Sequence, residues 1–328
     1  MSGQGGVGIR GLVNWKLVPL VLGLAALVFM GLILYGSFGE LSDQLARFPL
    51  PLLPVVLALS SLNYLLRYIR WRYYLRQTNV QVDEAQSIWV FLSGLSMSAT
   101  PAKVGELLKS YLLKQGADIP ISHTVPVVVM ERITDVMSVL LLLLVGVLAF
   151  GYGWPILVVG SVAVLAAAYG LGSRRGMRIL LKAPLMGRFR APLRESQERF
   201  QRLLTPQSLS LALALGAASW FGEAAGFWVV FLGLNVPVSL LEATFIYSFA
   251  MLAGAATLLP GGLGAAEVSM IGLLALLKVT GAAASAATLI IRVCTLWFAV
   301  FLGVVALFIC TRRMGQPKLP PSLRRDDL

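Results

Sequence analysis

The stretch LLPGGLGAAE, residues 258–267, interrupts a long apolar segment with a proline and closely spaced glycines. The interrupting residues are Pro260, Gly261, Gly262 and Gly264. Proline removes a backbone donor and glycine loosens a helix, so the chain can turn back at this point. Backbone groups freed at membrane depth must be covered by protein or face a watery cavity, because lipid cannot satisfy them. The stretch therefore predicts a re-entrant segment beside a polar path.

A second break of the same kind lies in the first half of the chain, in the stretch SATPAKVGE, residues 98–106. It contains Pro101 and Gly105. In both halves a glutamate follows the break, and an arginine lies deep in the next apolar run. These pairs are Glu106 with Arg132 and Glu267 with Arg292. Paired breaks in corresponding halves are a pointer to a transporter's substrate site.

Composition places the chain among membrane proteins. Of its 328 residues, 58% are hydrophobic and 13% are charged, whereas soluble domains are about half apolar and a quarter charged. A span needs about 20 apolar residues, and we expect full spans at 15–36, 51–73, 125–150, 154–171, 207–232 and 283–309. The interrupted segments 85–113 and 239–277 are predicted to be hairpins. The prediction is thus an all-α polytopic membrane protein with about six full spans and two re-entrant helical hairpins.

The distribution of positive charge predicts the topology. With both termini in the cytoplasm, only Arg47 and Lys278 of the 27 lysines and arginines fall outside, and Arg132 and Arg292 lie within spans. This bias follows the positive-inside rule. It explains the net charge of +12 by the membrane surface, so no nucleic-acid partner is expected. The unit of span, hairpin and span then occurs twice with opposite orientation, which is an inverted-topology repeat.

The predicted domain organisation follows from this topology. Residues 1–14 form a cytoplasmic tail, 15–310 a single transmembrane domain and 311–328 a second cytoplasmic tail. The repeat halves are 51–150 and 207–309, and a basic cytoplasmic loop at 173–206 lies between them. The alternative is six spans with two kinked helices and no symmetry.

Two segments rich in charge are expected at the inner membrane surface. Residues 67–74, RYIRWRYY, interleave aromatic and basic side chains at a span end, which is typical of an interfacial belt and inner-leaflet anchor. Residues 193–204, LRESQERFQRLL, suit a helix lying on an anionic leaflet. A solvated connector is the alternative for the second segment.

Seven charged side chains are expected to line the substrate path, namely Glu106, Glu131, Arg132, Asp135, Glu223, Glu267 and Arg292. Charges within a span are expensive and usually face the bundle interior or water. Glu131 and Asp135 lie one helical turn apart, with Arg132 beside them. Helix N-termini and arginines suit a phosphate or phosphodiester, and an inverted repeat would bring Arg132 and Arg292 to one central cavity. Buried ion pairs that fix helix packing are the alternative, although such pairs stabilise poorly.

No metal site or cofactor is predicted. Cys294 and Cys310 lie in one apolar segment without a C-x-x-C motif, and His123 is the single histidine. Cysteines in this pattern are typical of small apolar core residues and imply no disulfide framework.

Three motifs resemble the flippase-like membrane domain of lysylphosphatidylglycerol synthases. They are TPAKVGELLKSYLL at 100–113, ERITD at 131–135 and LLPGGLGAAE at 258–267, and the resemblance extends from about residue 15 to 310. By this resemblance, motif positions are occupied by Pro101, Gly105, Glu106, Glu131, Arg132, Asp135, Pro260, Gly261, Gly262, Gly264 and Glu267. Where the family often has glycine after the first proline, this chain has Ala102 and Lys103. In bifunctional members the domain moves an aminoacylated lipid that a separate soluble domain makes, and this chain is expected to be a free-standing member without that domain.

The breaks and the resemblance together predict an integral lipid translocator of the bacterial inner membrane, not an enzyme. The resemblance implies a cargo that is a phospholipid, a modified lipid or a polyprenyl or hopanoid-type lipid. The expected partners are membrane lipids with an anionic headgroup. Two alternatives stay open, namely a membrane-embedded lipid-modifying transferase or phosphatase, and a non-catalytic partner of the enzymes of envelope lipid synthesis.

Overall fold

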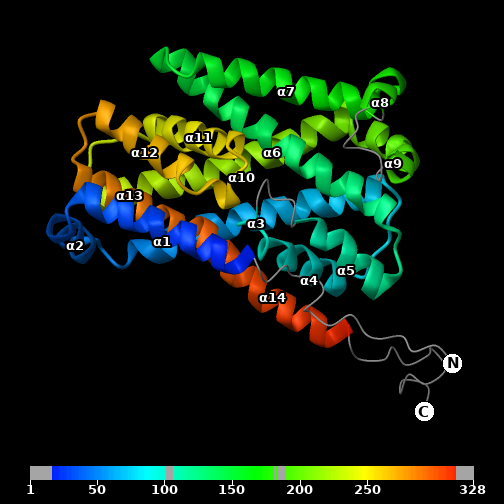
Figure 1. Cartoon of the computed structure of the whole chain (residues 1–328), viewed down its shortest axis with the longest axis horizontal. Coiled ribbons are helices and arrows are strands. Elements are labelled where there is room, and N and C mark those ends of the chain that lie inside the picture. Colours follow the sequence, from blue (N-terminus) through cyan, green and yellow to red (C-terminus); the bar gives the residue numbers. More distant parts are fainter. Residues whose placement is uncertain (1–16, 101–105, 181, 183–189, 315–328) are drawn as a thin grey trace.

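The computed structural model describes residues 17–100, 106–180, 182 and 190–314, and every regular element in these ranges is a helix (Figure 1). In chain order the elements are α1 (Leu17–Gly36), α2 (Phe38–Arg47), α3 (Leu52–Gln77), α4 (Glu84–Leu95), α5 (Leu108–Ala117), α6 (Ile121–Phe150), α7 (Trp154–Gly172), α8 (Arg174–Leu180), α9 (Arg190–Leu203), α10 (Pro206–Gly233), α11 (Leu240–Ala256), the 3-10 turn η4 (Pro260–Gly262), α12 (Ala265–Leu276), α13 (Gly281–Arg292), the π-helical segment η5 (Val293–Trp297) and α14 (Phe298–Met314).

Within these ranges, 5 helices are long and apolar enough to cross a membrane. They are α3, α6, α7, α10 and the continuous run Gly281–Arg312, which joins α13, η5 and α14. These correspond closely to the predicted spans that follow the first. The chain is therefore an all-helical, multi-pass membrane protein, as predicted.

The predicted first span, 15–36, corresponds to α1, but the structure adds a short helix that the sequence analysis did not anticipate. Val21–Gly36 and Phe38–Arg47 together are long and apolar enough to cross a membrane, and they are bent by 95°. The bend falls at Ser37, whose φ is 58°. A side chain at Gly36 would meet Ser285 at 3.2 Å, so glycine lets the end of α1 lie close against α13. Counting this bent pair, the described residues hold up to 6 spans.

Helices α3 and α10 lie in the middle of the molecule and pack against each other (Figure 1). Asn63 on α3 donates through Nδ2 to the carbonyl of Ser219 on α10 at 3.0 Å. Gly226 on α10 faces Val56 of α3, because a Cβ at that position would lie 3.5 Å from the Val56 side chain. Small residues at such an interface let two membrane helices approach closely. These two helices form the frame for the rest of the bundle.

The break at 258–267 separates two short helices, α11 and α12, which pack against each other. Ser239 and Glu242 form a capping box at the start of α11. The chain turns through Gly261 and Gly262, whose φ values are 62° and 66°. A Cβ at Gly262 would lie 3.0 Å from the Cα of Gly254 on α11. Glycine is therefore required here both by the backbone conformation and by the close approach of α11.

The other broken segment consists of α4 and α5, which are also short and in contact. Helix α4 begins at Asp83, whose side chain accepts from the backbone N–H of Gln86 at 3.2 Å. The predicted break residues Pro101 and Gly105 lie outside the described residues. The helices on either side of them are separate, and each is too short to span a bilayer.

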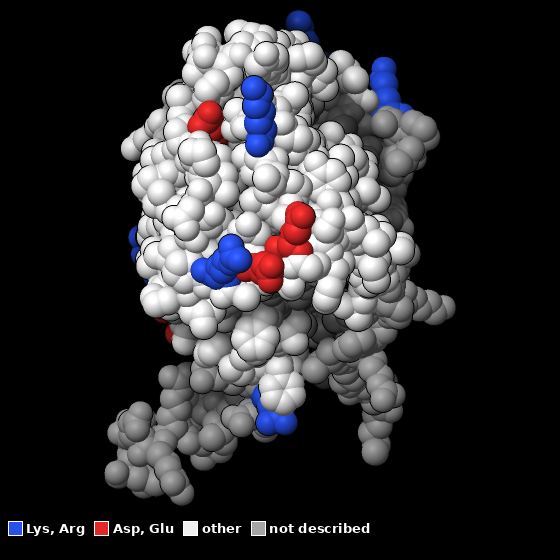
Figure 2. All heavy atoms as spheres, turned by 90° about the vertical axis from the view of Figure 1, so that its left-hand side faces the viewer, with Lys and Arg blue, Asp and Glu red and all other residues white. Residues whose placement is uncertain are grey.

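The two broken segments lie toward opposite ends of the molecule. Figure 1 shows α11 and α12 toward the end that carries α2, and α4 and α5 nearer the end that carries α8 and α9. Figure 2 faces the α2 end and shows only scattered charged side chains among uncharged ones. In contrast, exposed arginines such as Arg174, Arg175 and Arg178 occupy α8 at the other end.

The apolar face of α9 packs on protein. The prediction that the helix at 193–204 lies with this face on the lipid leaflet is therefore wrong. Phe200 and Leu203 are both 0% exposed, and α9 contacts α6, α7 and α3. Ser196 donates to the carbonyl of Ser122 on α6 at 2.8 Å. Apolar side chains that are already covered by neighbouring helices cannot also enter the lipid, so α9 is docked mainly on α6 and α7.

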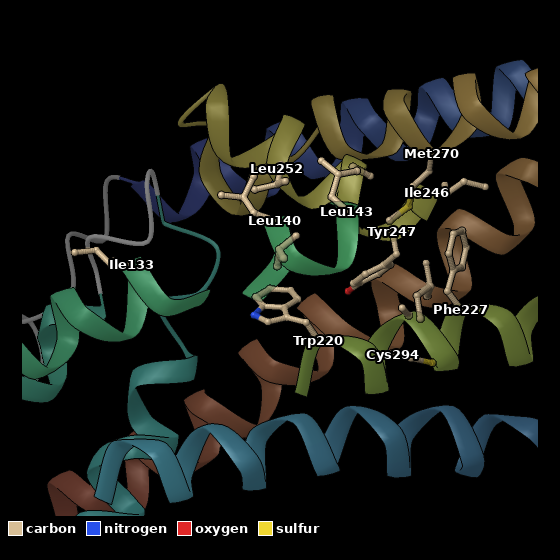
Figure 3. Packing of buried hydrophobic residues seen from close by; sticks show 14 of the residues in the cluster. Ile133, Leu140, Leu143, Trp220, Phe227, Ile246, Tyr247, Leu252, Met270 and Cys294 are labelled. Atoms are coloured by element: carbon tan, nitrogen blue, oxygen red, sulfur yellow. The ribbon is translucent and has the colours of Figure 1, made fainter. Parts of the chain in front are cut away.

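The apolar core runs through the bundle, and Figure 3 shows the part of it between α6, α10 and α11. The rings of Phe227 and Tyr247 are in tilted contact, with centroids 6.0 Å apart, and Trp220 and Leu143 lie in the same cluster. Gly146 lets α11 approach α6, because a Cβ there would lie 2.6 Å from the ring of Phe245. The core thus packs α6 against α11 beside the polar side chains described next.

Candidate functional site

Each glutamate that follows a break is paired with the arginine predicted to correspond to it. Arg132 Nη1 donates to Glu106 Oε1 at 2.9 Å, and Arg292 Nε lies 2.6 Å from Glu267 Oε1. The side chains of Glu106, Glu267 and Arg292 are at most 3% exposed, whereas that of Arg132 is 21% exposed. The same contact thus recurs in the two halves.

Asp135 on α6 is the centre of a cluster of arginines. Arg70 on α3 donates to its Oδ1, and Arg132 Nη2 lies 2.9 Å from its Oδ2. Arg67 Nη2 is farther from Oδ2, at 3.8 Å. Trp220 on α10 adds a long contact from Nε1 to Oδ1 at 3.4 Å. Side chains from three helices therefore converge on one carboxylate.

Lys109 on α5, within the first broken segment, links this cluster to Glu131. Its Nζ donates to Glu131 Oε2 at 2.6 Å and lies 3.6 Å from Glu106 Oε2. The ammonium group also lies 4.6 Å from the centre of the Trp71 ring and 5.3 Å from that of Phe91. Aromatic faces stabilise a buried cation, so the protein supplies Lys109 with both charge and ring partners.

The second pair is tied to the break itself. Arg292 Nη2 donates to the carbonyl of Gly261 at 2.7 Å, and the backbone N–H of Gly264 donates to Glu267 Oε2 at 2.7 Å. The N-terminal end of α12 was predicted to suit an anion, and the carboxylate of Glu267 itself occupies that position. Arg292 and Glu267 together fasten the turn η4 to α13.

Glu223 on α10 has a different neighbourhood. Its Oε2 accepts from the hydroxyl of Tyr247 at 2.6 Å, and the hydroxyl of Tyr64 nearby donates to the backbone carbonyl of Thr295 at 2.8 Å. Thr295 belongs to η5, which begins directly after Arg292. Single π-helical turns within α-helices are frequent at functional sites.

A cavity of about 300 Å³ lies among α3, α6, α10, α11, η4 and η5. Four of the predicted site residues line it, namely Arg132, Asp135, Glu223 and Arg292, and so do the break residues Gly261 and Gly262. Arg132 and Arg292 therefore line one shared cavity. Figure 3 shows Trp220 and Tyr247, which also line it, beside the leucines of α6.

The remaining predicted residues that the structure describes do not line the cavity. Glu106 and Glu267 each contact a lining arginine. Glu131 is buried against Lys109 and does not line the cavity. Pro260 is buried in η4, and Gly264 begins α12. The cavity therefore gathers the charged residues of both halves, with Glu131 set apart.

The prediction of a surface anchor at 67–74 is wrong for most of the segment. Arg70, Trp71 and Tyr74 are each 0% exposed, and Arg67 is 5% exposed. Only Arg72 among the segment's arginines behaves as expected, because it is partly exposed and pairs with Glu84. Lys109, also assigned to the cytoplasmic surface, is 1% exposed. These cations count toward the interior cluster instead.

A signal for this burial was present in the sequence. The buried positions on α3 repeat at the three- and four-residue spacing of one helix face. They are Val56, Ser60, Asn63, Tyr64, Arg67, Arg70, Trp71, Tyr74 and Leu75. Polar residues that share a face with apolar ones across a whole span indicate a face turned to protein. Positive charge counted without regard to helix face cannot show this.

The single histidine and the two cysteines, for which no metal site was predicted, do not line the cavity. His123 at the start of α6 lies 3.7 Å from Glu195 of α9, and Cys294 and Cys310 are buried free thiols. Within the part of the chain that the structure describes, no three histidine, cysteine, aspartate or glutamate side chains are grouped to hold a metal ion.

Together these features define a multi-pass helical membrane protein whose broken segments and spans enclose a charged cavity. Residues 17–303 match the family described as the lysylphosphatidylglycerol synthase TM region. The match covers most of the chain, and the protein belongs to this family.

Similar proteins from archaea are described as UPF0104 membrane proteins. One from Methanothermobacter thermautotrophicus is 25% identical over 319 residues, which cover 88% of this chain and 94% of the relative. One from Methanocaldococcus jannaschii is 24% identical over 233 residues, covering 67% and 97%. One from Pyrococcus horikoshii is 21% identical over 287 residues, covering 76% and 84%. These descriptions name a membrane protein and no activity.

Proposed function

We propose that the protein is a lipid translocator that passes a polar headgroup through its charged cavity while the lipid tails stay in the bilayer. The observation that carries this proposal is a single cavity lined from both broken segments. Ser98 comes from the first, Gly261 and Gly262 come from the second, and Arg132 and Arg292 come from the spans that follow. Irregular backbone at membrane depth is tolerated where it lines such a cavity.

The pattern of helix packing supports an inverted-topology repeat, with halves at 51–150 and 207–309. Helix α3 packs on α10, α5 packs on α6 as α12 packs on α13, and α4 packs on α14 as α11 packs on α6. The broken segments lie toward opposite ends of the molecule (Figure 1). In the proposed repeat both are re-entrant hairpins, which open to opposite sides and give the cavity alternating access.

The proposed orientation places α8, α9 and both termini on the cytoplasmic side of the cell membrane. Exposed arginines gather on α8, whereas the opposite end carries scattered charges (Figure 2). Cytoplasmic loops carry the excess of lysine and arginine in membrane proteins. For a bacterial host this membrane is the inner membrane.

The cavity favours transport over chemistry. Its carboxylates contact arginines or a tyrosine hydroxyl, and His123, the single histidine, contacts Glu195 away from the cavity. The family description refers to the membrane region of a synthase of a modified phospholipid. We propose that this chain handles such a lipid or a related one and leaves its covalent structure unchanged.

Transbilayer movement in liposomes tests the proposal. The purified chain is reconstituted with a trace of phosphatidylglycerol that carries a fluorescent headgroup-proximal label. A membrane-impermeant reductant then bleaches the outer leaflet. Wild-type protein should expose the inner-leaflet pool, and Arg132→Ala should slow this because the headgroup loses a charged contact in the cavity.

The matched control is Arg72→Ala, which removes an arginine of the same helix bundle that is partly exposed and paired with Glu84. It should move lipid at the wild-type rate. Chromatography of the recovered lipid reports any chemical conversion. Bleaching no faster than in protein-free liposomes would overturn the translocator, and a new lipid species would favour the transferase or phosphatase.

A further inference from the structure

The interior cluster around Asp135 gathers four cations with their carboxylates. Among the described residues, the cations are Arg67, Arg70, Lys109 and Arg132, and the carboxylates in ion pairs with them are Glu106, Glu131 and Asp135. Glu223 also acts electrostatically on Arg67. Burying a charge without a close partner is unfavourable. The distance of each cation from its carboxylates therefore shows which one has donors left for a ligand.

The ion-pair distances single out Arg67. Arg70 donates directly to Asp135, Lys109 lies 2.6 Å from Glu131, and Arg132 lies 2.9 Å from both Glu106 and Asp135. Arg67 Nη2 lies 3.6 Å from Glu106 and 3.8 Å from Asp135. Both of these carboxylates are held more closely by another cation. Arg67 is thus the cation of these four that lies farthest from a carboxylate.

Arg67 also has donors to spare. Its Nε and Nη2 are buried and find no hydrogen-bond acceptor among the described residues. The residue is 5% exposed, and it lines the cavity. A guanidinium group with unsatisfied donors at a cavity wall points to an anionic ligand, because such donors are expensive to leave unpaired.

We infer that Arg67 binds the phosphate group of a lipid that enters the cavity, with Arg132 beside it. The guanidinium fork matches two phosphate oxygens, and charge-assisted bonds of this kind are short and strong. A bound phosphate would accept from the Arg67 donors that the described residues leave without an acceptor. The main headgroup contact is then made from α3. The sequence alone had predicted Arg132 and Arg292 for this role. The inference rests on the proposed function only in taking the ligand to be a lipid.

The apolar part of the cavity favours a lipid phosphate over a free one. Leu258 and Leu259 line the cavity and are also 62% and 41% exposed on the outside of the molecule. Val139, Leu252 and Leu296 continue the apolar lining inside. A phosphate held at Arg67 could therefore remain joined to an acyl chain that leaves along Leu258 and Leu259 toward the bilayer.

Lipid binding by the full chain in a non-ionic detergent tests this inference separately from transport. Native mass spectrometry would follow titrations with phosphatidylglycerol, phosphatidic acid and a diacylglycerol of the same chains, with inorganic phosphate as a soluble competitor. Wild-type protein and the Arg72→Gln control should prefer both phospholipids over diacylglycerol. Arg67→Gln should lose about tenfold or more of that preference, since it removes a charge-assisted bidentate contact.

Thermal unfolding distinguishes a binding role from a structural one. Arg67→Gln should leave the unfolding temperature of the lipid-free protein unchanged or higher, because Glu106 and Asp135 keep their closer cations Arg132 and Arg70. Arg70→Gln should lower it, because Asp135 loses its closest partner. Should Arg67→Gln not accumulate, Arg67→Lys keeps the charge without the fork and should still weaken phospholipid binding.

Three results would overturn the inference. The first is undiminished phospholipid preference in Arg67→Gln or Arg67→Lys. The second is a destabilised Arg67→Gln that keeps its lipid preference. The third is displacement of the bound lipid by inorganic phosphate as effectively as by phosphatidic acid, because the site would then bind a soluble anion and not a lipid. Lipid movement that is independent of Arg67 would leave the translocator standing without this site, whereas Arg67-dependent binding without movement would support the site and overturn the translocator.

Discussion

Arg292 and Glu267 form a buried ion pair in which Nε and Oε1 are 2.6 Å apart. Both residues also hold the turn between α11 and α12, because Arg292 binds the carbonyl of Gly261 and Glu267 binds the N–H of Gly264. The pair joins the break to the span that follows it. If the broken segment moves relative to α13, either this ion pair breaks or α13 moves with the segment.

Glu267→Gln should destabilise the protein by about 3–5 kcal/mol, because it leaves the Arg292 charge buried without a countercharge. Thermal unfolding in detergent would show a lower midpoint. The double variant Glu267→Gln with Arg292→Gln should recover much of the loss, since no charge then remains buried. If the double variant is as unstable as the single, the pair contributes through geometry rather than charge.

Lys109→Met tests the pair on the other side of the molecule. Glu131 is 0% exposed and would lose its closest cation, so we expect a loss of about 3–5 kcal/mol. The control is Lys114→Met, which breaks the exposed pair between Lys114 and Asp118 at 2.5 Å and should leave the unfolding midpoint unchanged. Equal midpoints for the two variants would contradict burial of the Lys109 pair.

Gly262→Ala should destabilise the turn at the break by about 1–3 kcal/mol. Its φ is 66°, and its new Cβ would lie 3.0 Å from the Cα of Gly254. Gly272→Ala on α12 is the matched control, because a Cβ there meets nothing within 4 Å and alanine favours a helix. Thermal unfolding of the two variants should differ clearly in direction, and equal effects would mean that the turn tolerates a side chain.

Cysteine labelling tests the proposed orientation. In a background without Cys294 and Cys310, single cysteines replace Lys278, at the end that carries α12, and Arg178, on α8. Both positions are exposed. An impermeant reagent added to intact cells should label the first and spare the second until the membrane is opened. Labelling of both in intact cells would rule out the proposed topology.

The number and the places of the spans could be predicted from the sequence, because each depends on the length of a local apolar run. The break at 258–267 was equally local, since proline and glycine act on their own backbone. The correspondence of Glu106 with Arg132 and of Glu267 with Arg292 was also readable, because each pair occupies matching places in the two halves.

Only the tertiary structure decided which charges meet. Arg70 and Asp135 are 65 residues apart in the chain, and their contact depends on how α3 is rotated against α6. Hydropathy and charge counting average over the faces of a helix, so they placed Arg67, Arg70 and Lys109 at the membrane surface, whereas packing turned these side chains inward. The same limit applies to α9, whose apolar face suits lipid by pattern and is covered by α6 in the fold. The local sequence determines which segments lie in the membrane. The packing of the whole bundle determines which side of each helix faces protein and which faces lipid.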